Sequence, residues 1–193
     1  MKGKLHLGCG KKILEGYVNL DIVESEGVDV VQDVTKGLPF EDNSFEEVLC
    51  IDFLEHIAQE KVIFVINEIW RVMKDRAILK IHVPEAPGVT AFQDPTHRSY
   101  WNEETFTYFI KKHPRREYCS SLYGINAMFK MKSIAREERL THKYAVSHGR
   151  TVFKIIKMIL GKDFSRGKYK KVSMSDYLLN VELIAVKNEE DNI

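Results

Sequence analysis

Long hydrophobic runs are missing from this 193-residue sequence, and no apolar stretch approaches the ~20 residues that a membrane span requires. The first ten residues, MKGKLHLGCG, lack the apolar core of a secretory signal. Cysteine is scarce as well, because Cys9, Cys50 and Cys119 lie far apart without a CxxC pair or zinc spacing. These absences predict a protein of the reducing cytoplasm, without a membrane span, a disulfide framework or a metal site.

Charge is unevenly distributed along the chain. The formal net charge is +1, yet residues 111–172 contain seventeen Lys and Arg against four Asp and Glu. Such a segment indicates either an anionic partner, such as RNA, or a solvated basic surface. Residues 141–175 predict a basic helical insertion before the last strand, with an amphipathic helix at 151–162. That helix is expected to pack on the sheet, with a membrane surface or a partner as the alternative.

Seven short runs rich in Val, Ile and Leu predict β-strands. They cover residues 4–8, 17–21, 28–33, 46–52, 77–84, 125–137 and 180–187. The apolar residues of 58–74 recur at helical spacing and predict a helix between the fourth and fifth strands. Alternating strands and helices indicate one α/β domain over residues 1–193, with a doubly wound, mostly parallel sheet of about seven strands.

The segment after the fifth strand is expected to form the substrate side. Residues 84–101 hold three prolines and a glycine, which predict a long loop. Asn102 is a good N-cap for a following helix, and Lys111 suits its last turn. Since ligands bind outside the carboxyl ends of parallel strands, residues 84–124 are predicted to lie over the site.

The first crossover is too short for a helix. A strand of about five residues spans ~17 Å, and a helix that returns this distance needs about eleven residues plus turns. Only residues 11–20 separate Gly10 from Asp21, and the last three of these belong to the next strand. The crossover is therefore predicted to be a loop, with at most one helical turn at KKILEG.

A missing first helix limits the choice of cofactor. Dinucleotides rest their pyrophosphate on the N-terminus of that helix, and Ile13 stands where their GxGxxG pattern has its third glycine. A nicotinamide oxidoreductase is therefore disfavoured. S-adenosylmethionine carries no phosphate, and it needs a glycine turn followed by a carboxylate for its ribose.

Three motifs in order carry a family resemblance over roughly residues 4–110. They are LHLGCG, the NLD that ends at Asp21, and QDVTKGLPFEDNSFEEVLCIDFLEHI. Together they resemble class I S-adenosylmethionine-dependent methyltransferases, of the small type with a shortened first crossover. The turn at 73–77, MKDRA, departs from the family's LKPGG, which leaves the shape of that turn open.

The resemblance implies S-adenosylmethionine as the cofactor and a Rossmann-like fold. The glycine turn would contact the methionine part, Asp21 the ribose and Asp33 the adenine amine. The implied cofactor residues are Gly8, Cys9, Gly10, Asp21, Ile22, Asp33, Val34, Cys50 and Asp52. The two cysteines are interpreted as packing residues that line the site, because nothing in the sequence places a base beside either.

Polar residues of the 84–101 loop are the candidates for the acceptor side. His97 is the preferred base, followed by Asp94, and the substrate contacts are Glu85, Arg98 and Tyr100. DPTH resembles a segment that lies over the pocket in some members of the family. Two plainer interpretations stay open, because an acid before proline is also a turn signal and His97 can be a surface residue.

The sequence predicts in-line methyl transfer to the oxygen or nitrogen of a small molecule, such as a sugar or a metabolite. A hydroxyl acceptor would need a base, which a neutral amine or a carboxylate would not strictly need. Two alternatives remain. The basic region of residues 111–172 can bind RNA or another phosphorylated substrate, or the chain can bind the cofactor without catalysis, as a scaffold. The oligomeric state is left open.

Overall fold

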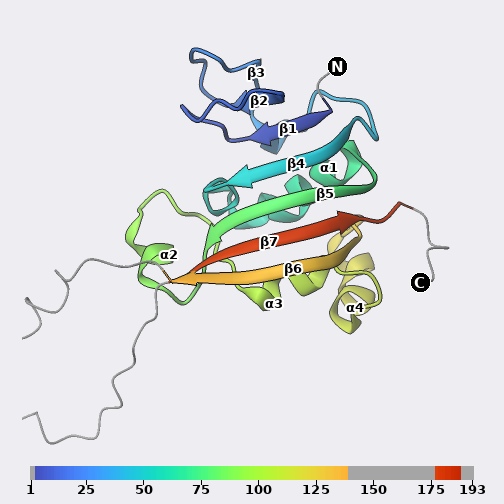
Figure 1. The fold of residues 1–193 in the computed structure, drawn as a ribbon. Helices are drawn as coiled ribbons and strands as arrows, with labels where there is room; N and C mark the ends of the chain where they lie inside the picture. Colours follow the sequence, from blue (N-terminus) through green and yellow to red (C-terminus); the bar gives the residue numbers. More distant parts are fainter. Residues whose placement is uncertain (1–2, 139–176, 188–193) are drawn as a thin grey trace, which may run out of the picture.

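The computed structural model describes residues 3–138 and 177–187 (Figure 1). Seven strands form one sheet in the order β3-β2-β1-β4-β5-β7-β6. Their bounds are Lys4–Leu7 (β1), Tyr17–Asp21 (β2), Val30–Val31 (β3), Phe45–Ile51 (β4), Met73–Pro84 (β5), Phe129–Glu138 (β6) and Tyr177–Ala185 (β7). The first five strands in this order, β3, β2, β1, β4 and β5, run parallel to one another. Strand β7 is antiparallel to both of its neighbours, β5 and β6. The predicted Rossmann-like α/β fold is confirmed.

The helices are short. The α-helices span Val62–Val72 (α1), Val89–Gln93 (α2), Glu103–Phe106 (α3) and Pro114–Tyr123 (α4). The 3-10 helices span Val34–Lys36 (η1), Leu54–His56 (η2), Gln59–Lys61 (η3) and Thr107–Phe109 (η4). Among the described residues none of them is long and apolar enough to cross a membrane. The predicted insertion at 141–175, with its helix at 151–162, lies outside the described residues.

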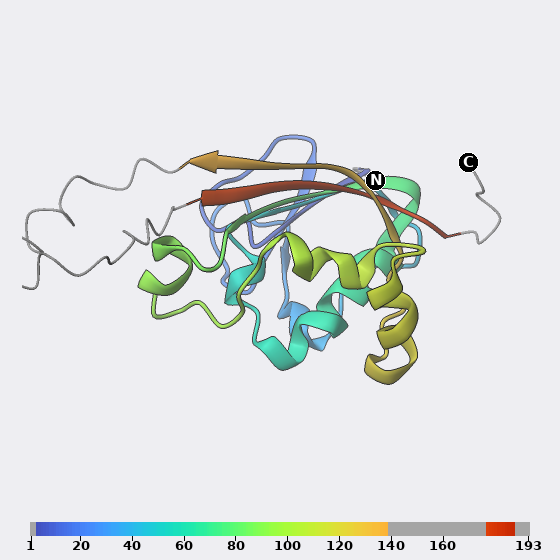
Figure 2. The same cartoon turned by 90° about the horizontal axis from the view of Figure 1, so that it is seen from below.

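The described helices cover one face of the sheet (Figure 2). Along β5, Ala77, Leu79, Ile81 and Val83 are buried, whereas the residues that alternate with them are only half-buried. Alternation of this kind is typical of a sheet with one covered face. The other face lacks described helices because the first crossovers are short: β1 and β2, and likewise β2 and β3, are joined by segments that contain turns and no helix.

Several predicted boundaries are corrected by the structure. The expected helix at 58–74 divides into η3 and α1. It ends at Val72, because Met73 already pairs with Phe45 as the first residue of β5. The strand expected at 28–33 keeps only Val30–Val31. The departing turn 73–77 is an irregularity of β5, in which Arg76 adopts a positive φ of 61°.

The segment after β5 also differs from its prediction. Residues 84–101 are not a plain loop, because they contain the five-residue helix α2. Asn102 caps α3 as expected, in a capping box with Thr105. That helix stops after one turn and continues as η4, so Lys111 lies beyond it, and Pro114 opens α4.

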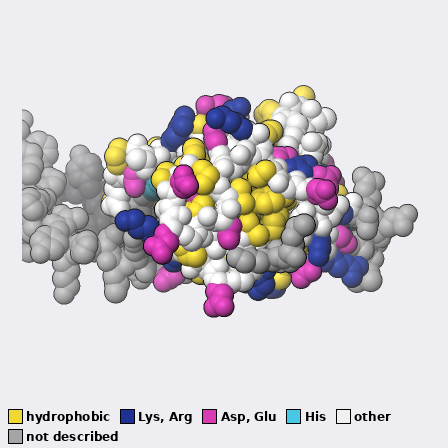
Figure 3. Space-filling view, turned by 90° about the horizontal axis from the view of Figure 1, so that it is seen from above, with side chains coloured by type: hydrophobic (Ala, Val, Ile, Leu, Met, Phe, Trp, Pro, Cys, Tyr) yellow, Lys and Arg dark blue, Asp and Glu magenta, His cyan; other side chains and the backbone are white. Residues whose placement is uncertain are grey.

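Both edges of the sheet are protected from pairing with another strand. Strand β3 is only two residues long, and Figure 3 looks onto this edge, where apolar side chains gather near the centre. Val31 in β3 is 50% exposed, and Ile13 in the crossover between β1 and β2 is 39% exposed. The opposite edge strand, β6, carries three positively charged residues, Lys130, Lys132 and Arg136. Short or charged edge strands are common devices against aggregation.

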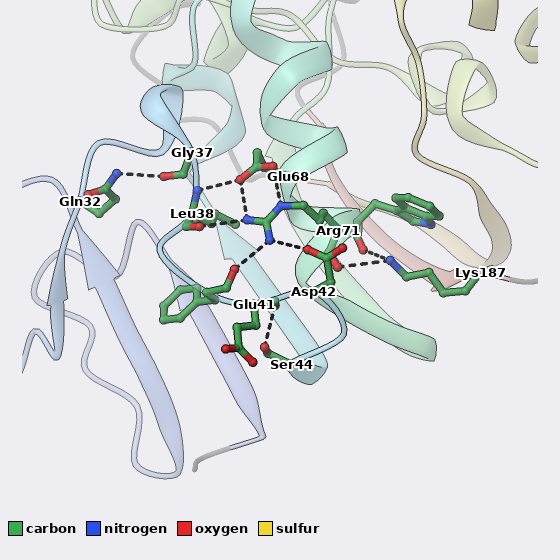
Figure 4. A network of polar contacts seen from close by, with 11 residues as sticks. Gln32, Gly37, Leu38, Glu41, Asp42, Ser44, Glu68, Arg71 and Lys187 are labelled. Atoms are coloured by element: carbon green, nitrogen blue, oxygen red, sulfur yellow. Dashed lines mark hydrogen bonds and ion pairs between the residues drawn. The ribbon is translucent and has the colours of Figure 1, made fainter.

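Arg71 at the end of α1 fastens the segment that leads from η1 into β4 (Figure 4). Its guanidinium donates to the Leu38 and Phe40 carbonyls at 3.0 and 2.8 Å, and it pairs with Asp42 at 2.8 Å. It also forms a fork with the Glu68 carboxylate, at 2.7 and 2.8 Å. The Arg71 hydrogen bonds lower the pKa of Glu68, which therefore stays charged beside the helix.

We expect Arg71→Met to lower the free energy of unfolding by about 2–3 kcal/mol, because it leaves two carbonyls and a half-buried carboxylate without their donor. Urea denaturation of the purified protein measures this loss. Arg76→Met is the matched control, since Arg76 is 75% exposed and lies 3.8 Å from Asp75. It should change stability by less than about 0.5 kcal/mol. Equal effects of the two variants would contradict the role given to Arg71.

Candidate active site

The glycine turn after β1 is built on two left-handed residues. Gly8 and Gly10 have φ of 65° and 51°, which side-chain-bearing residues rarely adopt. A Cβ on Gly8 would lie 2.3 Å from the Phe53 ring, whereas a Cβ on Gly10 would meet nothing within 4 Å. The two glycines are therefore required for different reasons, close packing at Gly8 and backbone conformation alone at Gly10.

Asp21 closes the turn from the end of β2. One oxygen of its carboxylate accepts from the Gly10 amide at 2.8 Å, and the other accepts from the Val23 amide at 3.0 Å. The backbone adds a bond from the Cys9 amide to the Leu20 carbonyl at 3.1 Å. The crossover between β1 and β2 contains turns and no helix, as predicted.

Buried Asn19 replaces the missing helix as the support of the crossover. Its side chain accepts from the Leu14 amide and donates to the Leu14 carbonyl, both at 3.0 Å. Asp29 accepts from the Asn19 backbone amide at 2.8 Å. The loop is thus fixed to β2 by hydrogen bonds, where other folds of this type would use helix packing.

A cavity of about 420 Å³ opens beside this turn. Of the residues predicted for cofactor and substrate, Gly8, Asp21, Ile22, Asp33, Val34, Asp52 and Arg98 line it. Leu20, Gln32, Thr35, Phe53, His56, Ile57 and Ala58 complete the wall. The volume is that of a small-molecule site.

Three predicted cofactor residues do not line the cavity. Cys9 and Cys50 are buried, at 2% and 0% exposure, and burial raises the pKa of both thiols, as expected for packing residues. Gly10 is exposed, and its amide is held by Asp21.

Asp33 and Asp52 both line the cavity, after β3 and after β4 respectively. The Asp33 carboxylate caps η1 by accepting from the Thr35 amide at 3.0 Å and from its hydroxyl at 2.7 Å, and this hydroxyl bond is the main cause of its lowered pKa. Asp52 follows β4 with a φ of 49° and lies 2.8 Å from Nδ1 of His82. That hydrogen bond is the main cause of the raised pKa of His82.

The predicted acceptor residues are spread over different surroundings. Glu85 is held by the Arg136 guanidinium at 2.8–3.0 Å, and Tyr100 lines a second cavity of about 390 Å³ beside α3 and α4. Asp94 caps its own turn by accepting from Thr96. Only Arg98 of this group reaches the cavity beside the glycine turn.

His97 lies in a cluster that sequence reasoning did not assemble. Its ligand atoms and those of Glu55 and His56 all lie within 4.8 Å of one another. Glu55 is 2% exposed, and burial raises its pKa to about 7. The adjacent Glu55 and His56 were visible in the LEH motif, but their approach to His97, about forty residues later, depends on tertiary contacts.

Residues 12–81 match the family model of a methyltransferase domain. No curated protein sequence matches the chain.

Solved structures of the same fold include a SAM dependent methyltransferase from Archaeoglobus fulgidus (TM-score 0.54, 17% identity, 94% of this chain and 85% of that one). A putative methyltransferase from Bacillus halodurans is similar (TM-score 0.53, 17% identity, 94% and 89%). The [4+2]-cyclase SpnF also shares the fold (TM-score 0.53, 15% identity, 96% and 75%). At these identities the likeness concerns the fold alone, and the cyclase shows that one fold serves more than one reaction.

The two glycines of the turn give a direct test of the packing described above. We expect Gly10→Ala to cost about 1 kcal/mol of unfolding free energy, the price of a left-handed alanine. Gly8→Ala should cost about 2 kcal/mol more, because its methyl group also displaces the Phe53 ring. Urea denaturation of both variants compares them, and losses of equal size would contradict the close contact with Phe53.

Proposed function

We propose that the chain, whose residues 12–81 match a methyltransferase family model, is a class I S-adenosylmethionine-dependent methyltransferase that binds this cofactor in the cavity beside the glycine turn and methylates a small molecule there. The observation that carries the proposal is the joint position of Gly8, Asp21 and Asp33 on that cavity's wall. The volume, about 420 Å³, fits a ligand of this size.

Each part of the cofactor has a suitable partner in the proposed site. Asp21 uses one lone pair on each oxygen for the Gly10 and Val23 amides, so each oxygen keeps a second one for a ribose hydroxyl. Asp33, ionised because its pKa is lowered mainly by the Thr35 hydroxyl, can accept from an adenine amine. The backbone of Gly8, which lines the cavity, can contact the methionine part.

Methyl transfer is mainly a matter of alignment. The bound cofactor supplies a methyl group activated by its sulfonium charge. The residues of this chain hold the acceptor in line with that methyl and exclude water, which is where most of the rate gain arises. For a hydroxyl acceptor, we propose His97 as the base, with Asp94 3.9 Å from its Nε2; because His97 does not line the cavity, the proton would reach it through the neighbouring His56, which does.

The cavities in the described part of the chain bear on the class of acceptor. The second cavity, of about 390 Å³ beside α3 and α4, offers Tyr100 and Tyr108 as apolar walls with polar tips. Small concave sites of this kind favour a small-molecule acceptor.

The three cysteines are buried free thiols, which suits a reducing cytoplasm.

RNA is the second candidate, and α4 supports it. Tyr118 and Leu122 are 75% and 65% exposed on this helix, which also carries Arg115 and Arg116. Exposed aromatic side chains beside an exposed arginine, here Arg115, suit single-stranded nucleic acid. Binding of an RNA oligonucleotide that weakens steeply with salt would favour this candidate, and no binding at low salt would remove it.

Asp21 is the carboxylate proposed to bind the ribose. Asp21→Ala should weaken binding of S-adenosylmethionine and S-adenosylhomocysteine at least about tenfold, because it removes charge-assisted hydrogen bonds. Isothermal titration calorimetry measures this, with NAD as a ligand that should not bind. Glu24→Ala is the matched control, since Glu24 is an exposed acid three residues further along. Unchanged affinity in Asp21→Ala would refute the assignment.

Turnover separates an enzyme from a scaffold that only binds the cofactor. Purified protein, incubated with labelled S-adenosylmethionine and a small-molecule extract, should release S-adenosylhomocysteine and label a small product. Cofactor binding without any release across extracts and RNA would support the scaffold alternative.

A further inference from the structure

The loop after α2 is fastened to η2 so that side chains distant in sequence meet. The Glu55 carbonyl accepts from the Arg98 and Ser99 amides at 2.7 and 3.1 Å. The Ser99 hydroxyl donates to the Leu54 carbonyl at 2.9 Å, and the buried Trp101 indole donates to that hydroxyl at 3.0 Å. This backbone clamp places His97 beside Glu55 and His56, with the two imidazole centres 5.1 Å apart.

The hydrogen bonds of the two imidazoles indicate which ring nitrogen carries the proton in the neutral form. Nδ1 of His97 lies 3.0 Å from the Ala91 carbonyl, which can only accept, so Nδ1 carries a proton and the neutral ring has its lone pair on Nε2, 3.9 Å from the Asp94 carboxylate. The Thr96 hydroxyl donates to Asp94 at 2.6 Å and therefore accepts from Nδ1 of His56 at 3.1 Å. His56 thus also keeps its lone pair on Nε2, and Asp94 acts on it through Thr96.

Glu55 supplies an unsatisfied acceptor to the same cluster. Its side chain is 2% exposed, and Oε2 has no hydrogen-bond partner among the described residues. A buried carboxylate oxygen without a donor is costly unless a cation or a proton meets it. The cluster therefore combines a carboxylate that has one bare oxygen with two imidazoles, and one ligand atom of each of the three residues lies within 4.8 Å of the others.

We propose that Glu55, His56 and His97 bind a divalent transition-metal ion, such as Zn²⁺, Mn²⁺ or Fe²⁺, at the wall of the cavity beside the glycine turn. Two imidazoles and one carboxylate are a common donor set for these ions, and three protein ligands leave a position open. Ligand atoms bound at about 2.1 Å lie about 3.4 Å apart, so the three side chains draw in by about 1 Å through their torsions.

The surroundings of the cluster resemble the second shell of a metal centre. Metal-bound histidines usually donate their other ring N–H to a carbonyl or, directly or through another group, to a carboxylate. His97 does so to the Ala91 carbonyl, and His56 does so to Thr96 and thence Asp94. This shell fixes the ring orientations before any ion arrives.

The position of His56 connects the site to the chemistry of the cavity. His56 lines the cavity that Asp21 and Asp52 also line, so an ion there would stand close to an acceptor oxygen. His97 cannot be both metal ligand and free base, because its one lone pair serves a single purpose. The two roles therefore exclude each other, and metal binding decides between them.

Metal binding is measured without the cofactor, so that failure of this proposal and failure of cofactor binding are separate results. The full-length chain, stripped with a chelator and dialysed, is titrated with Co²⁺ by visible absorption and with Zn²⁺ by calorimetry. We expect one ion per chain at micromolar affinity. The thermal unfolding temperature should rise with Zn²⁺.

Matched variants locate the ion. Glu55→Gln, which keeps the shape of the side chain, and His97→Gln should each weaken Co²⁺ binding at least about tenfold and abolish the Zn²⁺-induced rise in unfolding temperature. His113→Asn, at the N-cap of α4, and the pair His142→Asn with His148→Asn should bind as the parent does. Circular dichroism and urea denaturation confirm that each variant is folded.

Three outcomes would overturn the proposal. These are no binding of Co²⁺ or Zn²⁺ below millimolar concentration, undiminished binding in folded Glu55→Gln and His97→Gln, and loss of binding in the His142→Asn/His148→Asn pair alone. The first would make Glu55 a buried carboxyl group that shares a proton with its neighbours. The second and third would place the ion elsewhere in the chain.

Discussion

The hydrogen bond between the Gly10 amide and the Asp21 carboxylate is the constraint on which the site depends. It joins the turn after β1 to the end of β2 across a crossover that is too short for a helix. Without a helix N-terminus, the loop gains its shape from left-handed glycines, from Asn19 and from this carboxylate. A ligand that needs a helix dipole for its phosphates is poorly served by such a loop, and one that needs a carboxylate beside a bare backbone is well served.

The other polar residues of the candidate site also lie at the carboxyl ends of the parallel strands. Strand β4 ends at Ile51, and Asp52, Glu55 and His56 follow within five residues. The loop after β5 returns across them and adds Arg98 to the cavity wall and His97 to the cluster. Parallel strands thus bring together groups from three separate stretches of sequence, as is usual where ligands bind outside the carboxyl ends of an open sheet.

Local signals predicted the fold well, and six of the nine residues proposed for the cofactor line one cavity. The apolar runs, the short crossover and the acid at Asp21 each depend on residues close in sequence, and the structure places them as expected. Helix α2 was missed because Val89–Gln93 is short, begins with two β-branched residues and follows Pro87 and Gly88. The meeting of Glu55 with His97 was missed because it depends on the Arg98 and Ser99 amides, whose choice of the Glu55 carbonyl is a tertiary event.

The short crossover also bears on the order in which the sheet assembles. Lys4 pairs with Tyr17 in β2 and with Glu47 in β4, partners that lie thirteen and forty-three residues away. Loop-closure entropy grows with the logarithm of this separation, so closing the first pairing costs about 1 kcal/mol less than closing the second. Low sequence separation also speeds folding. The absence of a helix in this crossover therefore favours early pairing of β1 with β2, and with it early formation of the glycine turn.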